Sequence, residues 1–375
     1  MTTVSVEQLS TDPHPTFHRL RAKAPLAWLP ALDAWVVTGH ERAIEVMLDP
    51  ETFTVDDPRF STEQVIGPSM LSLDGPEHRR HRDPFAPSFR AARIRAVETL
   101  ARSEARRLAT DFSTRGAGDL RAQVAAPLAI SLMSELLDLD GVDRGDILSW
   151  YRNIVDAVHV VTEGGEVPES GRRSFTELAN AVKAGSANSR LLSPIEREGE
   201  LSPDEIASNV AVLLFGGIVT AESSTAIAFR YLLDDPDLAG QVDADRSLLE
   251  PFAEETFRLE PSAGAIDRFA TRDVRIGESR VDAGQLVRVS LTAANRDPAV
   301  FPDPDRLDVS RANSRRNVTF ARGPHACLGI HLARLEIVAA VEALLDILPG
   351  LEGRGLAPVE GLVFRSPATV MATLS

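Results

Sequence analysis

The sequence contains a single cysteine, Cys327, among 375 residues. One thiol excludes an intrachain disulfide framework, and it excludes zinc or iron–sulfur sites that need several cysteine ligands. Positive charge is also scarce, because 40 Lys and Arg stand against 55 Asp and Glu and leave a net charge of −15. This excess of negative charge makes the molecule as a whole a poor partner for nucleic acid or an anionic membrane surface.

Long hydrophobic runs are lacking as well. The N-terminus, MTTVSVEQLSTDPHP, is polar and has no apolar segment of the kind found in a signal peptide or anchor. No window of the sequence approaches the roughly 20 apolar residues of a membrane-spanning helix. We therefore expect a cytoplasmic protein without a membrane attachment.

The length and the hydrophobic pattern predict one mainly helical domain over residues 1–375, with minor β-structure. A hydrophobic content of 43% is sufficient for a sizeable core. Residues 50–74 lack periodicity and are expected to be mostly loop. Short strands are expected at 26–29, 34–37, 274–276 and 286–291, and helices at 16–24, 40–48, 90–112, 126–139, 143–161, from 174 onward, and between Cys327 and about 348.

The strongest predicted helix begins near residue 203 and continues for about 30 residues. Ser202 is a candidate N-cap, Pro203 suits the first turn, and Glu205 completes a capping box with Ser202. A helix of this length is long enough to cross a whole domain.

Cys327 lies between Gly323 and Gly329, just before the last predicted helix. Glycine permits tight turns and the close approach of a flat ligand to the backbone. The amide groups and the dipole of a helix N-terminus favour an anion, so we expect them to lower the pKa of the thiol and stabilise a thiolate. A thiolate is a nucleophile or a metal ligand, whereas a lone cysteine without such a setting is more often a small inert core residue.

The stretch Phe320-Ala-Arg-Gly-Pro-His-Ala-Cys-Leu-Gly329 resembles the haem-binding loop of the cytochromes P-450, which are haem-thiolate monooxygenases. The resemblance implies that Cys327 is the axial ligand of haem b (iron protoporphyrin IX), and that Phe320, Gly323 and Gly329 shape the loop around it. Ala321 replaces a glycine of the family pattern. We expect its methyl group to be tolerated if the backbone there avoids a positive φ.

Three further motifs of the same family occur in the same order. Glu255 and Arg258 in EETFR lie on one helix face, and the resemblance pairs them with Arg311 of a Pro-rich segment as a structural triad that holds the cysteine loop. On its own, Glu-x-x-Arg is an ordinary surface pair. His78 and Arg82 in DGPEHRRHRDPF match a second motif, and with Arg268 and His325 they are expected to bind the haem propionates.

The middle of the long helix carries Gly216 and Gly217, which suit contact with a porphyrin and a local kink. The resemblance gives Thr220 the hydroxyl that manages dioxygen and its protons. The family's usual acid is replaced by Val219, and Glu222 is turned by about 300° from that position. We expect protons to arrive through water and Thr220, with help from a polar group of the substrate, rather than through Glu222.

The resemblance implies an oxidoreductase that inserts one oxygen atom from O₂ into a mid-sized, largely apolar organic compound, as in secondary metabolism. Electrons would come from NAD(P)H through a separate ferredoxin and ferredoxin reductase. Arg79, Arg80, Arg82 and Arg90 form a basic cluster that would attract an acidic ferredoxin or simply face solvent. We expect a monomer. The residues expected around the substrate are Val65, Ile66, Met70, His159, Ile218, Val219, Ala265, Ile266 and Phe364.

Two other classes of function stay open at this stage. The missing acid at Val219 suits a haem-thiolate protein with a peroxide-driven or non-oxygenase role, such as sensing. A cysteine hydrolase would use Cys327 with His325 or His331, but neighbours in one loop seldom point at each other. Colour would separate a hydrolase from a haem protein, and turnover with redox partners would separate a monooxygenase from a sensor.

Overall fold

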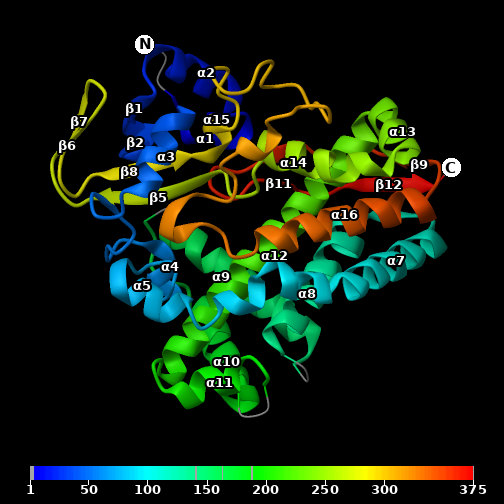
Figure 1. The fold of residues 1–375 in the computed structure, drawn as a ribbon, viewed down its shortest axis with the longest axis horizontal. Helices are drawn as coiled ribbons and strands as arrows, with labels where there is room; N and C mark the ends of the chain where they lie inside the picture. The colour runs from blue at the N-terminus through cyan, green and yellow to red at the C-terminus, as the bar shows by residue number, and fades with distance from the viewer. Residues whose placement is uncertain (1–3, 140–141, 163, 187–188, 375) are drawn as a thin grey trace. The chain divides into compact units, whose positions relative to one another are not determined.

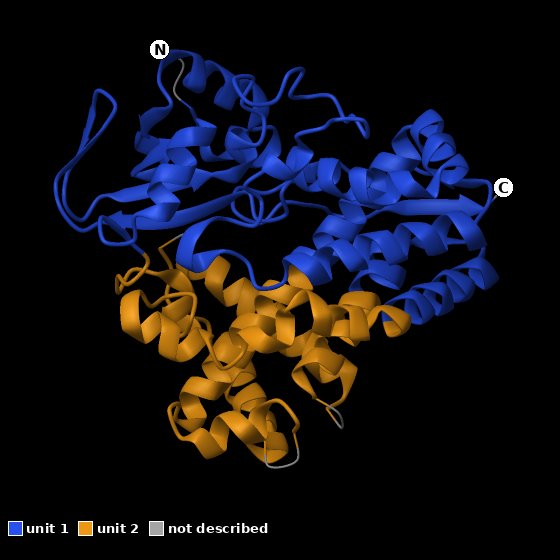
Figure 2. Ribbon diagram, viewed as in Figure 1, with its two compact units in different colours: residues 1–54, 101–126, 220–375 blue, residues 55–100, 127–219 orange. Residues whose placement is uncertain are grey.

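The computed structural model describes residues 4–139, 142–162, 164–186 and 189–374. It is mainly helical with a minor share of β-structure, which confirms the predicted fold class (Figure 1). Two compact units divide the chain (Figure 2). Unit 1 comprises residues 1–54, 101–126 and 220–375, and unit 2 comprises residues 55–100 and 127–219. The single domain over residues 1–375 stays a prediction.

Unit 1 contains the β-structure of the described residues. Its main sheet has the strand order β1-β2-β8-β5-β3, in which β2 and β8 are parallel and the other pairs are antiparallel. The strands are β1 (Leu26–Leu29), β2 (Ala34–Val37), β3 (Phe53–Thr54), β5 (Ala265–Ala270) and β8 (Leu286–Ser290). The smaller sheets combine β4 (Ala117–Asp119), β12 (Met371–Leu374) and β9 (Leu351–Gly353), then β6 (Val274–Ile276) with β7 (Ser279–Val281), and β10 (Val359–Glu360) with β11 (Ser366–Pro367).

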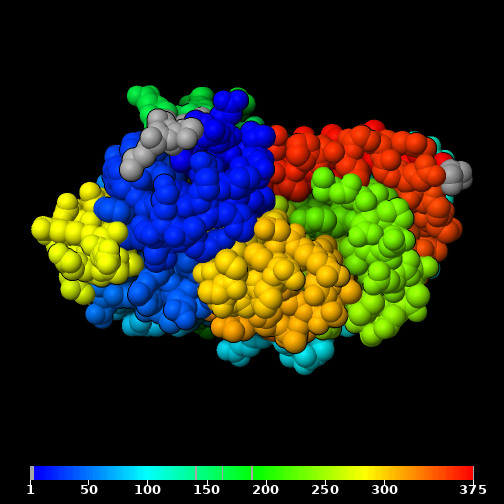
Figure 3. All heavy atoms as spheres, turned by 90° about the horizontal axis from the view of Figure 1, so that it is seen from above, coloured from blue at the N-terminus to red at the C-terminus, as the bar shows by residue number. Residues whose placement is uncertain are grey.

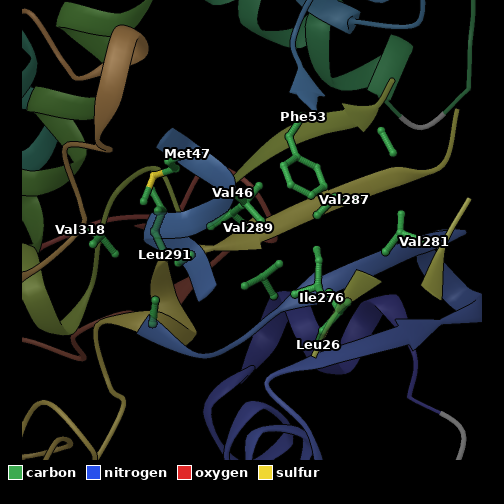
Figure 4. Close-up of a cluster of buried hydrophobic side chains, with 14 residues drawn as sticks. Leu26, Val46, Met47, Phe53, Ile276, Val281, Val287, Val289, Leu291 and Val318 are labelled. Atoms are coloured by element: carbon green, nitrogen blue, oxygen red, sulfur yellow. The ribbon is translucent and has the colours of Figure 1, made fainter. Parts of the chain in front are cut away.

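The core of this region lies between the sheet and helix α3 (His40–Leu48) (Figure 4). Val287 and Val289 of β8 are fully buried and belong to one cluster with Val46 and Met47 of α3. Alternate residues of a strand share one face, which explains why these two valines point into the same cluster. The cluster also includes Val318, so the segment that leads to Cys327 is anchored in this core.

Some of the other helices of unit 1 are joined by ion pairs along their lengths. Arg102 and Arg106 of α7 form ion pairs with Glu342 and Asp346 of α16, so these two helices run side by side. Besides α3, the helices of unit 1 are α1 (Val6–Thr11), α2 (His14–Lys23), α7 (Glu98–Arg115), α13 (Pro236–Ala244), α14 (Leu249–Leu259), α15 (Leu291–Ala294) and α16 (Ile330–Ile347). Between α15 and α16 the chain is irregular, and residues 298–313 form a surface patch, orange-yellow in Figure 3.

Unit 2 is helical over its described residues. Helix α9 packs against both α4 and α10. The helices are α4 (Ser61–Ile66), α5 (Gly75–Arg82), α6 (Ala91–Ala96), α8 (Ala126–Leu137), α9 (Arg144–Thr162), α10 (Glu169–Gly185) and α11 (Leu192–Glu198).

Helix α12 (Pro203–Asp234) runs through both units as one continuous element of 32 residues. The predicted capping box is confirmed, since Ser202 N donates to Glu205 Oε2 at 2.8 Å and Glu205 N donates to Ser202 Oγ at 3.3 Å. The sequence prediction understated the apolar character of α12, which is long and apolar enough to span a membrane. However, 78% of its apolar window is buried inside the protein, as in a core helix.

Most predicted elements are confirmed, and one expectation is wrong. The hairpin of β1 and β2 and helix α3 occur where predicted. The single helix expected over residues 90–112 is two helices, because Val97 leaves the helical conformation between α6 and α7. Residues 50–74 are mostly loop, as expected, and they include one short helix, α4. Helix α12 is continuous through Gly216 and Gly217, and the local kink expected there stays a prediction.

Candidate functional site

The loop before α16 presents the sulfur of Cys327. Cys327 N donates to Phe320 O at 2.8 Å and closes the loop, and a 3₁₀ turn over Gly323–His325 lies inside it. Gly329 N donates to Cys327 Sγ at 3.2 Å, and the side chain of Cys327 is exposed. A backbone N–H directed at sulfur favours the thiolate over the thiol. The loop is therefore arranged to offer an anionic sulfur ligand.

The backbone of this loop is left-handed at two positions. Gly323 has φ +76°, and a Cβ atom there would lie 2.7 Å from the carbonyl oxygen of Met47 in α3. Ala321 has φ 54°, so the condition under which its methyl group would be tolerated without strain is not met. The loop closes through Ala321 in a conformation that costs a residue with a Cβ atom about 1–2 kcal/mol.

Phe320 contacts two residues that the sequence analysis missed. The ring of Phe257 meets it edge to face, with 4.8 Å between ring centroids, and the guanidinium of Arg334 lies 5.8 Å from its centroid. Arg334 Nε is in turn 2.5 Å from Glu254 Oε1, and Glu254 is buried. In the sequence, only proximity to predicted site residues could have indicated Glu254 and Arg334. Glu254 directly precedes Glu255, and Arg334 follows Cys327 by two helical turns.

The predicted triad is assembled in unit 1. Arg258 Nε and Nη2 donate to the two carboxylate oxygens of Glu255 at 2.6 and 2.8 Å, and both side chains have 0% exposure. Arg311 Nε donates to Glu255 Oε2 at 3.1 Å from the irregular segment after α15. The two arginines also donate to carbonyl oxygens of that segment, namely those of Asn295, Pro302, Asp303, Pro304 and Arg306. The triad therefore ties α14 to the chain that leads into the cysteine loop.

The four candidate propionate ligands fall in two units. In unit 1, Arg268 is buried on β5 and donates from Nη1 to Asp267 O at 2.7 Å, while His325 ends the 3₁₀ turn beside the cysteine. In unit 2, His78 and Arg82 lie on α5, one helical turn apart as expected. Each pair combines an imidazole with a guanidinium, a donor set that suits a carboxylate.

The two glycines of α12 have different surroundings. A Cβ atom at Gly217 would lie 2.4 Å from Met133 Sδ of α8, whereas one at Gly216 would meet nothing within 4 Å. Gly217 therefore serves the packing of α12 against α8, and only Gly216 leaves its face open. Ile218, the next residue, has 0% exposure.

Glu222 is committed to an ion pair two residues after Thr220. Arg121 Nε donates to Glu222 Oε1 at 2.8 Å, and Arg121 Nη1 donates to Pro367 O at 2.8 Å. Two residues along a helix are turned by about 200°, so Glu222 points away from the face of Thr220. This geometry agrees with the expectation that Glu222 does not replace the acid missing at Val219.

A second buried acid, Glu336 of α16, was missed by the sequence analysis. It is 1% exposed, and neither carboxyl oxygen has a hydrogen-bond partner among the described residues. Burial, together with the negative charge of Glu222, raises the pKa of Glu336 well above its ordinary value of 4.5. Glu336 is therefore a neutral acid over a range of pH in which an exposed glutamate is ionised.

Glu336→Gln is expected to gain stability relative to the wild type as pH rises. A folded pKa above the unfolded one means that the wild type loses stability as pH rises from 4.5 through the folded pKa. Glutamine removes this titration, so the difference in unfolding free energy grows by about 1.4 kcal/mol per pH unit in that window. Denaturant unfolding at several pH values measures it, with exposed Glu278→Gln as the control. Parallel pH profiles for Glu336→Gln and the wild type would contradict the prediction.

The candidate pocket residues differ in accessibility. Ile66 and Ile218 are 0% exposed, so the structure gives no support to their role in a substrate wall. In unit 1, the segments around Ala265 and Phe364 lie side by side, because Gly264 N donates to Val363 O at 2.6 Å and Arg365 N donates to Ser262 O at 2.8 Å. Val65, Met70 and Ala265 are buried, Val219, Ile266 and Phe364 are half-buried, and His159 is exposed.

An exposed cysteine sulfur at a helix entry, near a buried Glu–Arg–Arg cluster in a mainly helical fold, is the arrangement expected of a haem-thiolate protein. The family model named Cytochrome P450 matches residues 186–347. Cytochrome P450 107B1 of Saccharopolyspora erythraea is 32% identical, over 92% of this chain and 90% of that protein. Mycinamicin IV hydroxylase/epoxidase of Micromonospora griseorubida is 31% identical, over 89% and 88%. The crystal structure of CalO2 superposes with a TM-score of 0.89 at 27% identity and covers 99% of both chains.

The chain belongs to the cytochrome P450 family. Its relatives are named as monooxygenases and hydroxylases, so it is an oxidoreductase of the monooxygenase class. The family implies haem, and the exposed sulfur of Cys327 with its backbone N–H donor fits an axial thiolate. Membership in this family sets aside the cysteine hydrolase as the function of the loop.

Proposed function

We propose that this protein oxidises a mid-sized, largely apolar secondary metabolite by inserting one oxygen atom from O₂. The observation that carries the proposal is the cysteine loop, in which Gly329 N donates to an exposed Cys327 Sγ at 3.2 Å. Haem b bound through this sulfur would supply the activation of dioxygen. Thiolate ligation donates electron density to iron and favours O–O cleavage.

In unit 1 the proposed haem contacts are the sulfur of Cys327 and the side chains of Arg268 and His325, which would neutralise propionate charge. In unit 2 we propose His78 and Arg82 for the same purpose. The residues proposed to approach the porphyrin face are Gly216, Phe320, Gly323 and Gly329.

Electrons are proposed to come from NAD(P)H through a ferredoxin and its reductase. Arg79 and Arg90 are exposed and suit an acidic partner. Arg80 is less suited to this role, because it pairs with Glu77 at 2.8 Å and with Glu205 at 2.6 Å. Charge reversal at Arg79 or Arg90 is the informative change for partner binding.

The substrate class is supported by the names of the relatives. One relative acts on mycinamicin IV, one on 20-oxo-5-O-mycaminosyltylactone, and one is named nocardicin C N-oxygenase. The half-buried residues Val219, Ile266 and Phe364 are apolar and suit a compound with large hydrophobic surface. These three side chains are the proposed specificity residues, and hydroxylation, epoxidation and heteroatom oxidation all fit them.

The test of this function is a screen of purified holoprotein against such metabolites. A substrate that enters the site should shift the haem absorption spectrum, and it should give a product heavier by one oxygen atom when O₂, NAD(P)H, ferredoxin and reductase are supplied. Cys327→Ser serves as the matched control and should give neither. Product that forms with peroxide but never with O₂ and electrons would instead favour a peroxide-driven role, the alternative that Val219 raises.

Thr220 is expected to control coupling between NAD(P)H oxidation and product formation. Its Oγ1 is the hydroxyl proposed to hold water and pass a proton at a helix position without a neighbouring acid. Removing one such hydrogen bond in Thr220→Val should lower product per NAD(P)H by roughly tenfold and release peroxide. Thr220→Ser should restore coupling, because it keeps the hydroxyl.

Glu222→Gln is the comparison for this prediction. It weakens the ion pair with Arg121, so we expect a lower melting temperature with coupling close to that of the wild type. Product and peroxide per NAD(P)H are measured for all three variants. The assignment is wrong if Glu222→Gln uncouples the enzyme and Thr220→Val does not.

A further inference from the structure

The segment Ile66–Met70 of unit 2 is held to helix α12 at both of its ends. Ser208 Oγ donates to Ile66 O at 2.6 Å, and Met70 N donates to Asn209 Oδ1 at 2.9 Å. The chain reverses between these points through Gly67, whose φ is +80°. Two neighbouring residues of α12 therefore close a short loop by side-chain hydrogen bonds, while the loop itself forms no strand or helix beyond Ile66.

The amide of Asn209 can have only one orientation. Its Oδ1 accepts from Met70 N, and its Nδ2 donates to Glu205 O at 2.8 Å. The same Nδ2 lies 2.9 Å from His81 Nδ1, so His81 Nδ1 must be an acceptor without a proton. The proton of the neutral imidazole is then on Nε2, which lies 3.3 Å from Glu205 Oε1 and 3.1 Å from Arg80 Nη2. A flipped amide would direct Nδ2 at Met70 N and lose that bond.

The charges around His81 keep its ring neutral near neutral pH. Burial lowers the pKa of His81 below its ordinary value of 6.5, and Arg80 on the same helix lowers it further. Glu205 of α12 and Glu77 of α5 oppose this effect. However, Arg80 already pairs with both carboxylates and lowers the pKa of Glu205 to about 2. A second proton on His81 would direct an N–H at the Asn209 N–H and force the amide to turn.

We infer that Asn209, oriented by His81, is a positioning residue that latches the segment Ile66–Met70 and thereby sets ligand access to the proposed pocket. The inference rests on the proposed function and on the sequence-based expectation that Val65 and Met70 lie around the substrate. The latch joins α5, α12 and the segment through one buried amide, which has 0% exposure. Releasing it frees Met70 N without removing any apolar contact of the segment.

Hydrogen exchange at the Met70 amide tests the latch independently of catalysis. In Asn209→Ala holoprotein, exchange at Met70 N should accelerate by roughly tenfold, the effect of losing one hydrogen bond. Ser208→Ala releases the other end of the segment with a smaller change and should accelerate exchange around Ile66 and Gly67. Asn153→Ala is the matched control, because it removes a part-buried side-chain hydrogen bond to Ser174 of α10. It should leave the exchange rate at Met70 N unchanged.

The second measurement is the association rate of phenylimidazole with the ferric haem, followed by absorbance. It should rise severalfold in Asn209→Ala and stay at the wild-type value in Asn153→Ala. Faster exchange at Met70 N with an unchanged association rate of phenylimidazole would overturn the inference. The hydrogen bond between Asn209 and Met70 would then stabilise the fold without affecting ligand access. Wild-type protein that binds no haem would refute the proposed function, whereas the exchange result would still report on the latch.

The third measurement is the pH dependence of exchange at Met70, corrected for intrinsic exchange. In the wild type, protection should fall about tenfold as pH drops below 6.5, when His81 gains its second proton. His81→Asn keeps an acceptor near the position of Nδ1 and does not titrate, so its protection should not depend on pH. Equal pH profiles for the wild type and His81→Asn would show that protonation of His81 does not affect the hydrogen bond between Asn209 and Met70.

Discussion

Glu255→Ala or Arg258→Ala is expected to lower the free energy of unfolding by about 3–5 kcal/mol and to prevent stable incorporation of haem. Both side chains are completely buried and joined by two hydrogen bonds of 2.6 and 2.8 Å. Truncating one partner leaves the other charge buried in the protein interior, where it has neither water nor the opposite charge of that partner to stabilise it. The loss is a large share of the 5–15 kcal/mol that stabilises an ordinary domain.

The effect should extend to the cysteine loop because of what the two residues hold. Arg258 donates to the carbonyl oxygens of Asn295 and Pro304, and Glu255 Oε2 accepts from Arg311 Nε and from Asp308 N at 3.0 Å. Without the cluster, the irregular segment before the loop loses its attachment to α14. We therefore expect purified variants with little haem rather than slow enzymes with full haem.

Arg42→Ala is the matched control for this prediction. Arg42 and Glu45 form an ion pair with the same spacing of three residues, on the exposed face of α3. Exposed pairs contribute about 0–1 kcal/mol, so this variant should melt close to the wild type and keep its haem. Thermal unfolding and haem content are measured on all three variants. Full haem content and a normal melting temperature in Glu255→Ala would contradict the role given to the triad.

Gly323→Ala is expected to destabilise the protein by about 2–4 kcal/mol and to distort the presentation of Cys327. The methyl group would be placed on a left-handed backbone with φ +76°, and its carbon would lie 2.7 Å from the carbonyl oxygen of Met47. A backbone carbonyl in a packed helix cannot move aside cheaply. Differential unfolding and the intensity of the thiolate-ligated haem spectrum measure the two consequences.

Two further variants separate the causes. Gly284 has φ +79° and open space around it, so Gly284→Ala reports the backbone cost alone, about 1 kcal/mol. Ala321→Gly should stabilise the protein by up to about 1 kcal/mol, because it relieves the left-handed alanine at φ 54° in the same loop. If Gly323→Ala costs no more than Gly284→Ala, contact with Met47 does not constrain the loop.

The parts of the site that could be predicted from sequence are those encoded by residues close in the chain. The flanking glycines and the helix that follows Cys327 marked the loop, and the capping box marked the start of α12. The pairing of Glu255 with Arg258 also follows from their spacing. Arg311 lies more than 50 residues away in sequence, and it was reached only through the resemblance to a family.

The parts that could not be predicted depend on contacts across the chain. Glu254 reaches Phe320 only through Arg334, and Glu336 is influenced by Glu222 of another helix. The hydrophobic periodicity of one segment does not predict contacts between residues of different segments. The positive φ of Ala321 could not be predicted for a related reason, because it occurs within a loop that is closed by the hydrogen bond from Cys327 N to Phe320 O.

The most direct test of the account is the absorption spectrum of the reduced, CO-bound protein beside that of Cys327→His. The account predicts the red-shifted Soret band of haem with a thiolate opposite CO in the wild type, and its complete loss in Cys327→His with haem still bound through imidazole. A wild-type spectrum without that band, or an identical band in Cys327→His, would contradict the claim that Cys327 is the ligand on which this protein is built.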